Sequence, residues 1–85
     1  MGVSEGWREI KYSSIFEEEL RGLERRRNAD PLCRIEDLEG ILKSLYALDG
    51  ADQDYRGELQ DTIMCATIAA YESYVARWRA ESAQK

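Results

Sequence analysis

The sequence predicts an all-α, three-helix protein: a long C-terminal helix is the spine, two shorter helices pack against it, and an extended N-terminal arm precedes them. The composition supports this, because 44% apolar and 34% charged residues with a single proline are typical of a soluble helical domain. Apolar residues recur every three or four positions over most of the chain, which is the period of an amphipathic helix. A run without charges, from Ile63 to Tyr71, marks the centre of the core.

The length of the chain predicts one domain. A chain of 85 residues buries only about 60% of its unfolded surface, so it supports one core of limited stability. We expect the arm over residues 1–12, because Trp7 and Ile10 fit neither the helical nor the strand period, and a single helical domain over residues 13–85. Since small cores are often reinforced by association, a second subunit is a natural source of further apolar contacts.

The first helix is expected over residues 14–27. Ser14 can cap its first turn while Glu17, three residues later, reaches back to the Ser14 amide as a capping box. Glutamates come early in this helix and arginines come late, an order that complements the helix dipole. The helix ends before Pro31, because the residue preceding a proline is disfavoured in the α conformation.

The second helix is expected over residues 32–48. Two starts are open: Asp30 as the cap with Pro31 in the first turn, or a later start near Arg34. Its apolar residues span an arc of about 160°, wide enough to pack between two neighbours. Gly40 lies on the opposite, polar face at a cost of about 1 kcal/mol relative to alanine, so it is either tolerated there or approached by a partner. The apolar residues are Ile35, Leu38, Ile41, Leu42, Leu45, Tyr46 and Leu48.

The third helix is expected over residues 54–81, with a start between Asp52 and Glu58, and at about 1.5 Å per residue it is roughly 40 Å long. Two adjoining apolar stripes cover about 200° of it, twice the arc that a surface helix needs. The first stripe comprises Met64, Ile68, Tyr71, Val75 and Trp78. The second stripe comprises Leu59, Ile63, Ala66, Ala70 and Tyr74. The small residues Cys65, Ala69 and Ala76 form a third side, where another helix can approach closely.

This surplus of apolar surface favours a protein-interaction module that homodimerises or binds another protein. Tyrosine and tryptophan are enriched in interaction hot spots. The aromatic residues of the third helix have the spacing of an ordinary core as well. They can therefore be either core residues or part of an external interface, and both interpretations stay open. The expected interface consists of Cys65, Ala69, Tyr71, Tyr74, Ala76 and Trp78.

A nucleic-acid-associated regulator is the alternative function. It would use the basic cluster of Arg21, Arg25, Arg26 and Arg27 to contact phosphates. Two observations count against it: the sequence pI is about 4.7, and the glutamates one or two turns earlier repel a polyanion. Nucleic acid is therefore not the favoured partner.

The acidic middle of the chain is a third candidate site. Residues 36–61 hold eight acids against two basic residues. The segment from Asp52 to Gly57 begins like an EF-hand loop, but Arg56 stands at its fifth position and Ile63 at its twelfth, where calcium requires a bidentate glutamate. The remaining interpretations are a surface for a basic protein partner or solvated charges around a turn.

Several chemistries are disfavoured by the composition. The chain has no histidine, which removes the usual general base and the commonest zinc ligand. Its cysteines, Cys33 and Cys65, fit no metal spacing. We therefore expect no enzyme, catalytic residue, metal, cofactor or small-molecule substrate. The sequence contains neither a membrane span nor a signal peptide, so we expect a cytoplasmic location.

Overall fold

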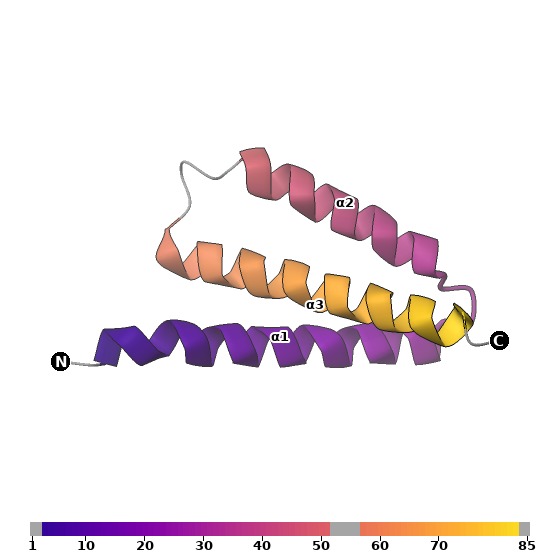
Figure 1. Cartoon of the computed structure of the whole chain (residues 1–85), viewed down its shortest axis with the longest axis horizontal. Coiled ribbons are helices and arrows are strands. Elements are labelled where there is room, and N and C mark those ends of the chain that lie inside the picture. Colours follow the sequence, from indigo (N-terminus) through magenta and orange to yellow (C-terminus); the bar gives the residue numbers. More distant parts are fainter. Residues whose placement is uncertain (1–2, 52–56, 84–85) are drawn as a thin grey trace.

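The computed structural model of this chain describes residues 3–51 and 57–83, which form three helices and no strand: α1 (Val3–Ala29), α2 (Ile35–Ala51) and α3 (Glu58–Ala83). Helices α1 and α3 run in the same direction and α2 runs opposite to both (Figure 1). Helix α3 lies between the other two and packs against each of them. The all-α fold with the C-terminal helix as its spine is therefore confirmed.

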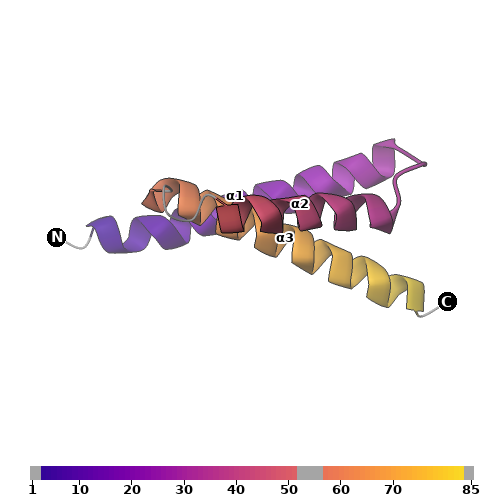
Figure 2. The ribbon, with the colours of Figure 1, turned by 90° about the horizontal axis from the view of Figure 1, so that it is seen from above.

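The lengths of the helices differ from the prediction for α1. Helix α1 has 27 residues, α3 has 26 and α2 has 17, so only α2 is short. The molecule measures 51 × 27 × 22 Å and its radius of gyration is 14.7 Å, whereas a compact domain of this length would have a radius of about 12 Å. The elongated shape arises because the N-terminal ends of α1 and α3 continue past the end of α2 (Figures 1 and 2).

The prediction of an extended arm over residues 1–12 is wrong for the residues described, because α1 begins at Val3 and continues through Ser14 without a break. The cause is contact with α3. Arg8 donates hydrogen bonds to Thr62 Oγ1 at 3.1 Å and to Asp61 Oδ2 at 3.2 Å. Packing of this kind supplies the stability that local propensity does not give a helix. The capping box expected at Ser14 is consequently not formed.

A tight turn joins α1 to α2. The Cys33 amide donates to the Asp30 carbonyl at 3.0 Å, and the Leu32 amide donates to Asp30 Oδ1 at 3.0 Å. Pro31 occupies the second position of this turn, where its fixed φ is favourable. The proline therefore belongs to the turn and not to the first turn of α2.

Of the two starts open for α2, the later one is confirmed. The Arg34 amide donates to Asp37 Oδ2 at 3.0 Å, which is the half of a capping box in which an acidic side chain reaches back to the cap residue. Helix α2 runs over Ile35–Ala51 and begins three residues after the predicted residue 32. Helix α3 runs over Glu58–Ala83 and begins four residues after the predicted residue 54. Glu58 is still within the interval from Asp52 to Glu58 that was predicted for this start.

The core lies where all three helices overlap. Each helix contributes to it: Leu23 from α1, Leu38 from α2, and Tyr74 with Val75 from α3 are buried together. The Trp78 ring meets the Tyr74 ring edge-on, with 6.2 Å between the ring centroids. The partly buried residues around this cluster are Leu20, Cys33, Ile35, Ile41, Tyr71 and Trp78.

Small side chains form the contact between α1 and α3 outside this core. Thr62, Ala66 and Ala70 are 2%, 0% and 0% exposed. They are spaced by four residues and so share one face of α3, and the hydrogen bond from Arg8 places the first of them against α1. Small residues on this face let the two backbones approach closely.

Candidate interaction surfaces

The structure divides the interface expected from the sequence. Tyr74 is only 1% exposed and belongs to the core, so its interpretation as a core residue holds and it offers no surface to a partner. Tyr71 and Trp78 are half-buried against the same core. Burial raises the pKa of the Tyr71 phenol, and the Glu19 carboxylate adds to this shift. Tyr71, Tyr74 and Trp78 are therefore mainly structural residues.

The small-residue side of α3 is accessible in part. Cys65 and Ala76 are exposed and Ala69 is half-buried. These side chains are small, so they offer little apolar area of their own. Whether this side forms an interface stays a prediction.

The second apolar stripe of α3 changes from buried to exposed along its length. Ala66, Ala70 and Tyr74 are at most 1% exposed, whereas Leu59 and Ile63 are 49% and 38% exposed. Leu59 and Ile63 are four residues apart and therefore adjacent on one face of the helix. The first two positions of this stripe thus lack the cover that the later positions have.

Helix α2 lies beside only part of α3. Tyr46 of α2 donates a hydrogen bond to Glu72 of α3, which raises the pKa of the Tyr46 phenol. Continuing this antiparallel register five residues further places Ala51, the last residue of α2, level with Thr67. No described part of α2 therefore reaches the first turns of α3.

We call this region the two-helix end and define it as residues 3–12 of α1 and 58–66 of α3. The contact of Arg8 with Thr62 shows that these two segments are level with each other. The four most exposed large apolar side chains of α1 and α3 lie in these two segments. Ile10 is 73% exposed, Leu59 49%, Ile63 38% and Tyr12 37%, and Trp7 and Met64 are half-buried.

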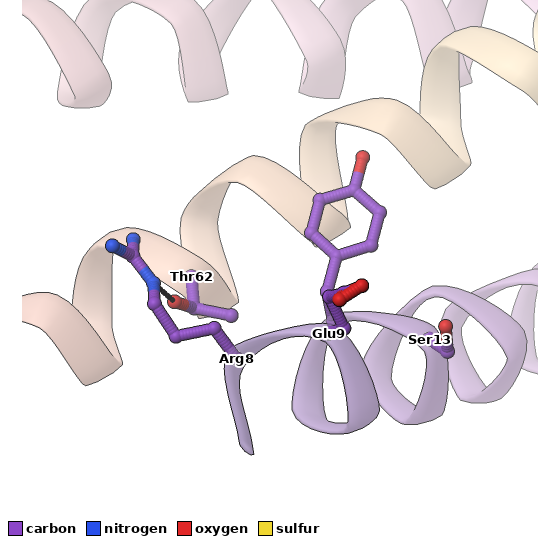
Figure 3. Close-up of a pocket in the computed structure, with 5 residues that line it drawn as sticks. Arg8, Glu9, Ser13 and Thr62 are labelled. Carbon is purple, nitrogen blue, oxygen red and sulfur yellow. Dashed lines mark hydrogen bonds between the residues drawn. The ribbon is translucent and has the colours of Figure 1, made fainter. Parts of the chain in front are cut away.

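A shallow hollow of about 330 Å³ lies along the two-helix end, lined by Arg8, Glu9, Tyr12, Ser13 and Thr62. Figure 3 shows Arg8 of α1 reaching across to Thr62 of α3, with Ser13 further along α1. A second hollow shares Tyr12 and Ser13 with the first, so the two are continuous along α1. The volume of the first hollow is at the lower end of the range of ordinary ligand sites.

Charges at this hollow are largely paired within the chain. The Arg8 guanidinium lies 3.2 Å from Asp61 Oδ2 and 3.7 Å from Glu58 Oε1. Both acids belong to the acidic middle of the sequence. The EF-hand-like segment that begins at Asp52 lies outside the described residues up to Arg56. Within the described residues, no three potential metal-binding side chains gather at one point.

The four arginines of the basic cluster do not form one surface. Arg21 pairs with Glu17 at 3.9 Å. The Arg27 guanidinium lies 3.9 Å from the centroid of the Trp78 ring and pairs with Glu81 at 3.2 Å. Consecutive residues of a helix point about 100° apart, so residues 25, 26 and 27 face three different directions. Arg21 and Arg25 are four residues apart and share one face of α1, and Arg26 and Arg27 lie on other faces.

The two cysteines lie in different surroundings. Cys33 is half-buried against the core and Cys65 is exposed on α3.

Over residues 3–51 and 57–83 the fold is that of an all-α protein of three helices, whose two longest helices are parallel and have no third helix beside them at one end. Comparison with family models, curated proteins and solved structures finds no match to this chain. None of its helices, over the residues described, combines the length and apolarity needed to cross a membrane.

Sequence reasoning missed the two-helix end, although Leu59 and Ile63 were part of a predicted stripe. Residues 1–12 were expected to be an arm, so no second helix was placed beside the start of α3. The pair of rings at Tyr12 and Phe16, stacked with centroids 6.4 Å apart, carried the signal that helix α1 begins early. Aromatic residues four positions apart are neighbours on a helix.

Proposed function

We propose that this chain is a protein-interaction module that forms a homodimer through apolar surface that its own helices leave uncovered. The observation that carries this proposal is the second stripe of α3, which is closed at Ala66 and Ala70 and open at Leu59 and Ile63. Burying a leucine or isoleucine side chain contributes about 1.5 to 3 kcal/mol, so covering the open positions provides a driving force for association.

The total surface of the chain supports the same proposal. The chain exposes 6189 Å², whereas a compact monomer of 9.8 kDa exposes about 5,200 Å². The excess is about 1,000 Å², and a standard protein interface removes about 800 Å² from each partner. One dimer interface is therefore enough to reduce the exposed surface area of the chain to about that of a compact monomer of the same mass.

Sedimentation equilibrium over a range of concentrations tests this function. We expect the mean mass to rise from that of one chain towards that of two as the concentration increases. Strictly monomeric behaviour at high micromolar concentration would refute the homodimer.

A further inference from the structure

We infer that the homodimer forms through the two-helix end, so that the two-helix ends of two copies pack into a four-helix arrangement about a two-fold axis. This inference rests on the proposed homodimerisation and adds the surface and the occupant. In a two-fold dimer the same patch of both copies meets itself. The two-helix end must therefore be apolar at its centre, and its charges must not repel the same charges of the second copy.

The apolar centre is provided by α3. Leu59 and Ile63 continue the line of residues that pack tightly further along the helix, and they are 49% and 38% exposed. No described part of α2 extends beyond the level of Thr67. Helices α1 and α3 present about 14 Å of length there, at about 1.5 Å per residue. Two further helices can pack against such a pair, because bundles of four helices share one core of this kind.

The charge of the two-helix end favours a second copy over a strongly charged partner. Over residues 3–12 and 58–66 the side chains sum to a net charge of −2. Arg8 is already engaged with Glu58 and Asp61 in the same chain. Like charges that face each other across an interface are costly, and a net charge this small keeps that cost low. A highly basic or acidic helix would find little to pair with.

The test uses one acidic substitution at three sites. Leu59→Glu places a charge in the two-helix end, Ala76→Glu places it on the small-residue side of α3, and Leu32→Glu places it in the turn between α1 and α2. Leu32 is 82% exposed and serves as the matched leucine control. Glutamate is favourable in the first turn of a helix, so Leu59→Glu is compatible with a folded monomer, which circular dichroism verifies.

We expect Leu59→Glu to weaken dimerisation about 100-fold or more, because the lost leucine is buried on both copies and each 1.4 kcal/mol is a factor of ten. Leu32→Glu and Ala76→Glu should dimerise like the original chain. Ile63→Glu is a second variant of the two-helix end. If both Leu59→Glu and Ile63→Glu leave the dimer intact, the location is wrong while the homodimer stands. If the original chain is monomeric, the proposed function itself fails.

Hydrogen exchange on the unmodified chain provides a second measurement that does not depend on any variant folding. Raising the concentration through the dimerisation range should increase amide protection in the two-helix end and leave the turn at residues 30–34 unchanged. Protection that rises only around Ala69 and Ala76 would move the interface to the small-residue side and overturn the inference.

Discussion

Replacement of Leu38 by alanine should be the most damaging single change in α2. Leu38 is 1% exposed and is the only buried side chain among residues 35–50. Truncating a buried leucine to alanine costs about 2 to 5 kcal/mol. A chain of 85 residues is stabilised by about 4 to 13 kcal/mol in total. The substitution therefore removes a large share of the stability and should release α2 from α3.

Urea unfolding followed by circular dichroism and by tryptophan fluorescence measures this effect. Leu48→Ala is the matched control on the same helix, because Leu48 is 50% exposed and should change the free energy of unfolding by less than about 0.5 kcal/mol. For Leu48→Ala, the unfolding curves from circular dichroism and from tryptophan fluorescence should coincide. Equal effects of the two substitutions, or a cost below about 1 kcal/mol for Leu38→Ala, would contradict the role of Leu38 in holding α2.

Three further substitutions have expected outcomes. Gly40→Ala should stabilise the monomer by about 1 kcal/mol, because an added Cβ meets nothing within 4 Å; a lower denaturation midpoint would contradict this. Arg27→Met should cost about 1 to 2 kcal/mol through loss of the contacts with Trp78 and Glu81, and Arg27→Lys should recover only part of it; full recovery by lysine would show that the planar guanidinium is not needed. Because its pKa is raised in the folded chain, Tyr71 contributes stability that is complete below about pH 10 and is lost as the pH rises through the folded pKa. Stability should therefore fall less steeply above about pH 10 in Tyr71→Phe, and parallel pH profiles of the two proteins would argue against this.

Local patterns in the sequence were sufficient for the fold class and for much of the second half of the chain. For α2 they left two starts open, and the later one, near Arg34, rests on residues a few positions apart, although the expected span of 32–48 began three residues early. The central position of α3 followed from the width of its apolar arc, which is a property of that helix alone. These features do not depend on knowing where distant segments meet.

The long-range contacts that hold the start of α1 could not be derived in this way. Arg8 is held by residues of α3 that are 53 and 54 positions away, and nothing near residues 3–12 signals these contacts. The same limit applies to the candidate site. A projection of α3 shows that Tyr74 and Ile63 share a stripe, but only the ends of the neighbouring helices decide that one is buried and the other is open.

The parallel orientation of α1 and α3 has a consequence for how the chain folds. A parallel pair cannot form as a helical hairpin, because its contacts, such as that between Arg8 and Thr62, close a loop of more than fifty residues. Closing such a loop costs entropy before any contact is gained, and distant contacts slow folding. The hairpin of α2 and α3 has the shorter connection and should form first, so that α1 docks last and completes the fold.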